Sequence, residues 1–220
     1  MTTIFEEEIQ CCACRKKSSH GNVGSTNSFG SSDLDTRPPE MQRSTIYYWI
    51  QRCPSCGYCS SDISKCNEKT KKLVESAEYQ GIIKGIDFSK VASSFLAKSY
   101  ENQQNKQYVD AAWNAIHAAW VSDDKQNNEA SKNCRKKAIF LINKANDKSY
   151  KIADQVGASE LITIDLMRRS GMFEPALKLA KNTNSDDIEE IIMKIIEYEI
   201  TLIQLNDIDS HTISEAIDKG

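Results

Sequence analysis

The spacing of apolar residues along the chain changes near Ser60. Before this point apolar residues are sparse, and residues 18–35 are dominated by Ser, Gly and Asn, a composition typical of a loop. After it, apolar residues recur every three or four positions, as on one face of an α-helix. We therefore expect an N-terminal module over residues 1–60, a helical domain over 61–206, and a polar, loosely held tail over 207–220.

Helices are expected along most of the second part of the chain. The first is predicted to begin at Ser60 or Ser61, either of which can cap it, and to carry Ile63, Cys66 and Ala77 on its apolar face. The later apolar stripes predict helices over 91–100, 108–120, 130–145, 161–169, 175–181 and 188–205. The helices over 161–169 and 175–181 are expected to form a helical hairpin, because Gly171 lies between them.

A single β-strand is predicted in the N-terminal module. Residues 44–51 are β-branched and aromatic, with Ile46 and Ile50 on one face and Trp49 on the other. Such a strand would lead directly into Cys53, as the strands of zinc ribbons do. The expected fold class is therefore mainly α, with a small β zinc-ribbon-like N-terminal module followed by an α-helical bundle.

Four cysteines in two Cys-x-x-Cys pairs carry the clearest chemical signal. The pairs are Cys11 with Cys14 and Cys53 with Cys56, and each tight turn can direct two sulfurs at one Zn²⁺. A site of four thiolates has no open position, so one structural zinc is expected. The neighbouring Arg15 and Arg52 are candidates to offset its negative charge.

Other cysteines and histidines leave the ligand set partly open. Cys12, Cys59 and His20 are each close enough in sequence to replace one of the four predicted ligands. By contrast, Cys66 and Cys134 are expected to be small core residues on apolar helical faces, and His117 is expected to pack inside a helix bundle.

Composition and charge narrow the classes of function. The chain has 220 residues, 27% of them charged, and a net charge of −3, which gives no overall attraction to nucleic acid or an anionic membrane. The first ten residues are acidic and lack the apolar core of a signal peptide, and no run of about 18 apolar residues occurs. We therefore expect a cytoplasmic protein without membrane contact, in which reduced thiols favour metal binding over disulfides.

Parts of the helical domain follow the pattern of tetratricopeptide (TPR) repeats. Trp113, Ile116 and Trp120 match a first repeat helix, and Gly171 with Phe173 matches the turn and start of a second. The two matches are about 47 residues apart, whereas the repeat is about 34 residues long. The pattern therefore indicates a TPR-like bundle without a regular array, and an ordinary helical bundle fits it equally well.

No special structural or functional role is expected of two groups of charged residues. Asp33, Asp35 and Arg37 lie beside two prolines, where an exposed Asp–Arg pair is usually solvated, although they could also brace the loop or bind a ligand. Asp123 and Asp124 are read as the turn that ends a helix.

The chain as a whole resembles an uncharacterised bacterial family, domain of unknown function 2225. The matching stretches are Cys11-x-x-Cys14, Ser32-Asp-Leu-Asp-Thr-Arg-Pro38, Tyr47-x-Trp49-x-x-x-Cys53-Pro-x-Cys-Gly-Tyr58, Ala118-Ala-Trp-Val-x-Asp-Asp124 and Arg168-Arg-x-Gly-x-Phe-x-x-Ala-Leu177. The resemblance implies a zinc-knuckle front, a TPR-like back and no established activity.

The sequence favours a non-enzymatic role. It contains no phosphate-binding Gly-rich loop, no His-Glu-x-x-His and no Gly-x-Ser-x-Gly motif. The expected function is a protein–protein interaction or scaffold protein that binds a protein or peptide partner. A zinc-ribbon nucleic-acid-binding or regulatory protein is a disfavoured alternative, supported by short basic runs. A thiol-redox protein using Cys53 and Cys56 is the third.

Overall fold

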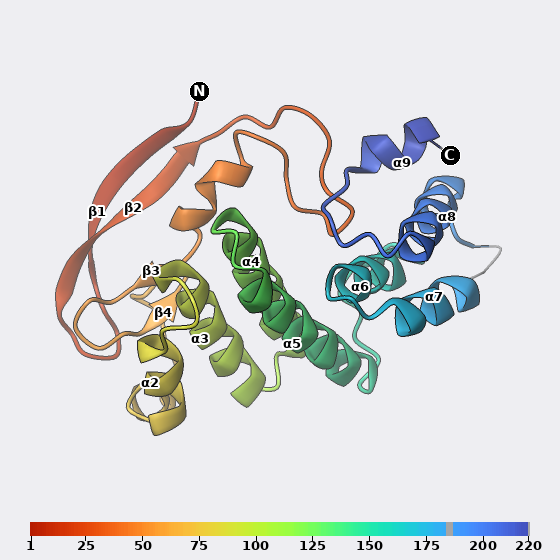
Figure 1. Ribbon diagram of the computed structural model, residues 1–220. Helices are drawn as coiled ribbons and strands as arrows, with labels where there is room; N and C mark the ends of the chain where they lie inside the picture. Colours follow the sequence, from red (N-terminus) through yellow and green to blue (C-terminus); the bar gives the residue numbers. More distant parts are fainter. Residues whose placement is uncertain (184–186, 220) are drawn as a thin grey trace.

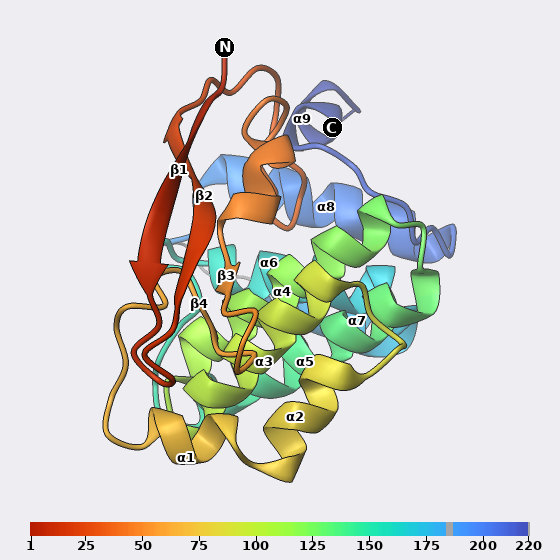
Figure 2. The same cartoon turned by 90° about the vertical axis from the view of Figure 1, so that its left-hand side faces the viewer.

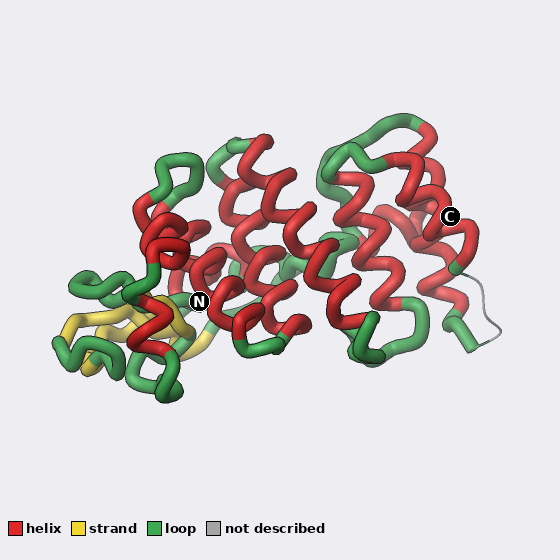
Figure 3. The backbone as a smooth tube through the Cα atoms, turned by 90° about the horizontal axis from the view of Figure 1, so that it is seen from below, coloured by secondary structure: helices red, strands yellow, loops and turns green. Residues whose placement is uncertain are grey.

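The computed structural model describes residues 1–183 and 187–219, and it confirms a mainly α fold (Figure 1). Two β-hairpins, one long and one short, form the N-terminal part, and a helical bundle follows. No helix in these residues is long and apolar enough to cross a membrane. Figure 3 shows the strands gathered at one end of the molecule and the helices stacked side by side away from them.

The expectation of a loop from residue 18 onward is wrong for its first part. Strand β1 (Thr3–Gln10) pairs antiparallel with β2 (Lys17–Ser25), and the two form a long ribbon along one side of the molecule (Figure 2). Cross-strand hydrogen bonds from Ser19 to Glu6 and from Asn22 to Glu7 hold the ribbon. The ribbon is stabilised by polar pairs across the two strands. It lacks the alternation of apolar and polar residues by which a strand is recognised in a sequence.

The strand predicted over 44–51 is also wrong. Arg43–Tyr48 forms a 3₁₀ helix, η1, and only Gln51–Arg52 (β3) is extended, paired with Cys59–Ser60 (β4). The Thr45 hydroxyl donates to the Gln42 carbonyl and accepts from the Trp49 indole Nε1. These local bonds satisfy the turn and outweigh the β preference of the side chains.

The first predicted helix begins about ten residues late. Residues 61–69 form no helix, and α1 (Thr70–Val74) and α2 (Ala77–Lys84) follow them. Ile63 is fully buried, its N–H donates to the Gln51 side chain and its carbonyl accepts from Cys12. Because these contacts tie residue 63 to the N-terminal module, Cys66 lies in an exposed loop and not in a helical core.

The remaining predicted helices are confirmed. Ser89 caps the first of them by accepting a hydrogen bond from the Ala92 N–H. Their bounds are α3 Lys90–Gln104, α4 Tyr108–Asp124, α5 Asn128–Asn146, α6 Ala158–Arg169, α7 Phe173–Asn182 and α8 Glu190–Gln204.

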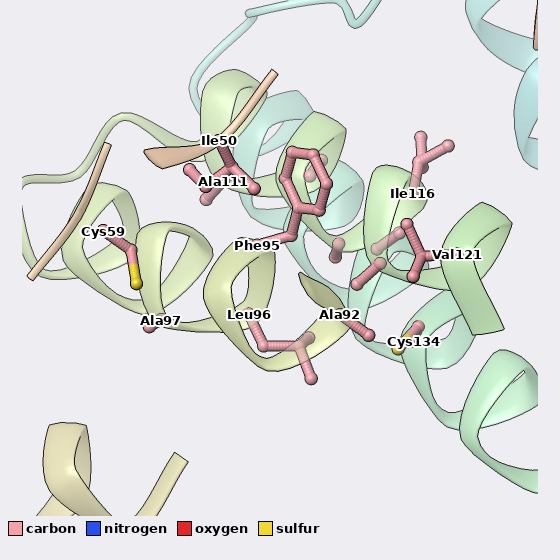
Figure 4. Packing of buried hydrophobic residues seen from close by; sticks show 14 of the residues in the cluster. Ile50, Cys59, Ala92, Phe95, Leu96, Ala97, Ala111, Ile116, Val121 and Cys134 are labelled. Atoms are coloured by element: carbon pink, nitrogen blue, oxygen red, sulfur yellow. The ribbon is translucent and has the colours of Figure 1, made fainter. Parts of the chain in front are cut away.

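Helix α4 lies at the centre of the bundle between α3 and α5 (Figure 1). Five alanines of α4 are completely buried, so neighbouring helices can approach it closely on two sides. Figure 4 shows Phe95 and Ala92 of α3 packed beside Ile116 and Val121 of α4. The same core includes Ile46 and Tyr58, so the N-terminal module and the helices share one hydrophobic interior.

The C-terminal residues are held more firmly than expected. Ile213–Lys219 forms α9, and Ala216 is completely buried in a second core beside α6 and α8. The segment after β2 crosses the molecule to reach this helix (Figure 1), where Ile213 N–H donates to the Ser32 carbonyl and Leu34 N–H donates to the His211 carbonyl. The prediction of a loosely held tail is therefore wrong for the described residues.

His117 lies inside a cluster of aromatic rings. The ring centroids of Trp120, Trp49 and Phe95 are 5.0, 5.3 and 5.3 Å from its own. Burial in these apolar surroundings lowers the pKa of His117 to about 4. The imidazole is therefore neutral in the folded protein at neutral pH.

This pKa predicts a loss of stability in mild acid. The pKa of His117 in the folded protein lies below its unfolded value of about 6.5. The folded state is therefore at its full stability with respect to this group above pH 6.5, and it loses stability as the pH falls toward 4. We expect His117 to account for roughly 3 kcal/mol of the unfolding free energy lost over this window. Urea unfolding at pH 7, 5.5 and 4.5 should show a shallower pH slope for His117→Phe than for the unaltered protein. Equal slopes for the two proteins would contradict the assignment.

Candidate metal centre

The two Cys-x-x-Cys segments form the same backbone turn. In the first, Cys11 N–H donates to Lys16 and the Cys11 carbonyl accepts from Arg15; in the second, Cys53 N–H donates to Tyr58 and the Cys53 carbonyl accepts from Gly57. Each turn closes one hairpin, β1–β2 or β3–β4. The fourth residue after each leading cysteine has a positive φ, +64° at Arg15 and +81° at Gly57, and glycine suits this conformation best.

The two turns face each other and bring four sulfurs together. The Sγ atoms of Cys11 and Cys56 are 3.7 Å apart, those of Cys14 and Cys53 are 3.6 Å apart, and all four lie within 4.8 Å of one another. Four sulfurs bound tetrahedrally at about 2.3 Å from one zinc would be separated by about 3.8 Å. The four cysteines therefore could hold a metal ion, and their spacing fits a tetrahedral site.

Burial and hydrogen bonding set the acidity of these thiols. Burial raises the pKa of Cys56 and of Cys11. Burial acts in the same direction on Cys53, but the backbone N–H groups of Cys56 and Ser55 and the Cys14 thiol outweigh it, so its pKa lies below the usual value. Deprotonation of Cys53 is therefore favoured relative to an ordinary thiol, and a thiol must lose its proton to bind a metal.

The other candidate ligands lie outside this cluster. Cys59 is completely buried, its thiol donates to the Gly57 carbonyl, and burial raises its pKa to about 11. His20 lies on β2 and bonds Ser18. Cys134 is a core residue, as predicted.

Cys12 and Cys66 are joined in a disulfide. This bond corrects two predictions, because Cys66 was expected in a helical core and Cys12 as an alternative ligand. It also departs from the expectation that all the thiols are reduced. The pairing connects the first Cys-x-x-Cys turn to the exposed loop that precedes α1.

The flanking arginines have different surroundings. Arg15 is exposed, whereas the guanidinium of Arg52 donates to the Ile83 carbonyl at 3.1 Å and to Ser93. Arg52 therefore links the second hairpin to α2 and α3. The cysteine cluster is in this way attached to the helical body and not to a separate lobe.

Sequence reading missed a buried charge network centred on Asp35. Asp35 is completely buried, and its carboxylate accepts from the Trp120 indole at 2.7 Å and from Arg169 at 3.1 Å. Arg169 also donates to Asp123 at 2.9 Å, and Arg135 donates to the same carboxylate. The expectation of an exposed, solvated loop cluster is therefore wrong, because residues from four segments, the loop at Asp35 and helices α4, α5 and α6, meet in the interior.

Neighbouring charged residues form further ion pairs around this network. Arg37 is buried and pairs with Asp124 at 2.6 Å, and Asp33 pairs with Arg43 and accepts from Ser210. Asp123 and Asp124 do end α4, as predicted, but they are also partners in these ion pairs.

A second buried network surrounds Arg168. Its guanidinium donates to Asp165 and to Glu199, each at 2.7 Å, and to the Asp207 carbonyl. Burial, with Asp165 nearby, raises the pKa of Glu199 well above its usual value. The network joins α6, α8 and the segment that leads to α9.

A sequence signal for the Asp35 network was present. The stretches that contain Asp35, Trp120 with Asp123, and Arg169 are among those on which the family resemblance rests, and the structure brings these residues into contact. Stretches of opposite charge within the family motif, although far apart in sequence, could have been predicted to form ion pairs with one another.

The fold and the cysteine cluster define a mainly α protein with an N-terminal four-cysteine module. Residues 4–197 match the sequence model of a family described as an uncharacterized protein conserved in bacteria (DUF2225). The chain belongs to this family, which confirms the resemblance. Searches of curated proteins and of solved structures gave no match.

Proposed function

We propose that Cys11, Cys14, Cys53 and Cys56 bind one structural Zn²⁺. The observation that carries this proposal is the approach of four sulfurs, from two identical turns, to the separations of a tetrahedral site. Zinc favours four thiolates in closed sites of this kind. All coordination positions would be filled by protein, so the metal would hold the two hairpins together and would not bind substrate.

Metal analysis of the purified protein tests the zinc proposal. We expect one equivalent of zinc per chain, and displacement with Co²⁺ should give the absorption bands of tetrahedral cobalt–thiolate coordination. A fully folded protein that contains no metal after expression in zinc-supplemented medium would contradict the proposal.

We further propose that this zinc-stabilised protein is cytoplasmic and non-enzymatic, and that it binds a protein or peptide partner through its helical body. The helices that lie side by side in the body support this function (Figure 3), because stacked helical hairpins offer extended surfaces to a partner. Partly exposed apolar side chains on this body, including Phe140 and Tyr150, are suited to such contacts.

Crosslinking in cells followed by reconstitution tests the partner proposal. A captured protein should bind the purified full-length chain in a defined ratio, and Phe140→Ser with Tyr150→Ser should weaken that binding without lowering the thermal midpoint. Retention of a nucleic acid instead, or reduction of a disulfide substrate that depends on Cys53, would replace the partner proposal with one of the two alternatives.

A further inference from the structure

A disulfide joins the first Cys-x-x-Cys turn to the loop that precedes α1. Cys12 lies inside this turn, directly after Cys11 and two residues before Cys14, whose sulfurs are both in the cluster. Its partner Cys66 is 54 residues away, in the segment 61–69. The bond therefore acts on the backbone that positions two of the four clustered sulfurs.

The segment 61–69 contacts both hairpins through hydrogen bonds as well. The Tyr58 hydroxyl, in the second turn, donates to the Lys65 carbonyl at 2.9 Å. The Ile63 carbonyl accepts from the Cys12 N–H, also at 2.9 Å. Because these contacts are single hydrogen bonds and the disulfide is covalent, the disulfide is the strongest connection between this segment and the first turn.

The disulfide closes a loop of chain that contains nearly all of both Cys-x-x-Cys turns. Cys14, Cys53 and Cys56 all lie between Cys12 and Cys66 in the sequence. A cross-link of this kind reduces the conformational freedom of the chain when it is not folded. A module that folds around a structural metal loses order when the metal leaves. The bonded chain gains less freedom in that step, so it should hold the metal more tightly.

The disulfide lies at the surface of the protein. Cys66 is exposed and Cys12 is partly exposed, whereas Cys59 and Cys134 are almost completely buried. In the cytoplasmic location proposed above, thiols are kept reduced, and the disulfides that do form are usually transient or redox-sensing. An exposed pair of cysteines next to a cluster of free thiols therefore points to a bond that forms and breaks with the redox state of the cell.

We propose that Cys12 and Cys66 form a redox-controlled bond that regulates how tightly the four-cysteine site holds its metal, an inference that rests on the zinc site proposed above. With the bond formed, the protein retains zinc. With the bond reduced, it loses zinc more readily. The bond would keep the metal in place under oxidising conditions, in which thiolates that have lost their zinc are open to oxidation.

Reduction of the bond is a thiol–disulfide exchange with a cellular dithiol. One thiolate of the reductant attacks the sulfur of Cys66, a mixed disulfide forms, and the Cys12 sulfur leaves as a thiolate that takes up a proton. The second thiol of the reductant then attacks the mixed disulfide and releases Cys66, so that the reductant leaves as a disulfide. In the reverse direction, oxidised glutathione accepts two electrons from the two thiols and leaves as two molecules of glutathione.

Chelator competition with the full-length protein tests the proposal. One sample is treated with oxidised glutathione and another with a dithiol. The reagents are removed under nitrogen, and both samples are reloaded with zinc and titrated with a chromophoric zinc chelator. We expect the oxidised sample to bind zinc about tenfold or more tightly than the reduced sample. Peptide mapping of the oxidised sample should show Cys12 joined to Cys66.

Two serine variants provide a matched comparison. Cys66→Ser removes the bond at an exposed position outside the sulfur cluster. Its zinc affinity should equal that of the reduced protein and should no longer respond to oxidised glutathione. Cys134→Ser removes a cysteine that takes no part in the bond, so its response to oxidised glutathione should match that of the unaltered protein.

The outcomes distinguish redox control from the zinc site itself. Equal zinc affinities in the oxidised and reduced samples, tighter binding in the reduced sample, or a response that persists in Cys66→Ser would overturn the redox control and leave the zinc site intact. Absence of zinc from both samples would overturn the zinc site, and the redox control with it.

Discussion

Replacing Cys53 with serine should abolish metal binding and unfold the N-terminal module. Serine is a much poorer ligand for zinc than a thiolate, and a structural zinc contributes its binding free energy to folding, about 10–16 kcal/mol in isolated zinc-finger peptides. We expect the unfolding free energy to fall by about 4 kcal/mol or more, with a loss of roughly 10 °C in thermal midpoint. Mass spectrometric metal analysis and thermal unfolding followed by circular dichroism measure the two effects.

Cys134→Ser is the matched control for this change. Cys134 is also buried, but it lies in the helical core on α5 and outside the sulfur cluster. The control should retain a full equivalent of zinc. Its unfolding free energy should fall by less than that of Cys53→Ser, because the only cost is a polar hydroxyl placed in the core. If Cys53→Ser retained zinc, or if both variants lost it equally, the ligand assignment would be wrong.

Replacing Arg169 with methionine should destabilise the protein by about 3–5 kcal/mol, the range measured when one partner of a buried ion pair is removed. Asp35 would then be completely buried with the Trp120 indole but without its cation, so either its charge is uncompensated or it must take up a proton, and both cost stability. Burial already raises the pKa of Asp35, and Arg169 opposes that rise. Urea unfolding at pH 7 gives the change in free energy.

A double-mutant cycle distinguishes loss of the ion pair from loss of packing. Asp35→Asn should be destabilising in the unaltered protein, but in the Arg169→Met background it should recover part of the loss, because it removes the uncompensated charge. Lys17→Ala breaks the exposed pair with Glu8, whose side chains are 64% and 63% exposed, and should leave the stability unchanged. Additive effects of the Asp35 and Arg169 changes would argue against direct coupling.

The helices from α3 to α8 could be predicted because their signals are local. Apolar side chains three and four positions apart lie on one helix face, and residues such as Ser89 mark the helix ends. The same holds for the four clustered cysteines: each Cys-x-x-Cys segment spans only four residues, so its spacing can be recognised in the sequence.

The features that sequence reading placed wrongly depend on distant partners. Strand β2 has little β character of its own and exists because β1 pairs with it. Ile63 belongs to the N-terminal module through the side chain of Gln51, twelve residues away. In η1, a local hydrogen bond between Thr45 and Trp49 favours the 3₁₀ helix over a strand. Propensity scales predict a strand here because they do not include such side-chain hydrogen bonds.

The helical bundle, the four-cysteine pattern and the family can all be predicted from the residues alone. The folded chain was needed to show that the sulfurs of two hairpins lie within 4.8 Å of one another, and that Asp35 contacts Arg169 across 134 residues of chain. It also decided which cysteines are in the cluster and that Cys12 pairs with Cys66. Helix periodicity and turn chemistry act over a few residues, whereas the burial of a charge depends on which distant segment packs over it.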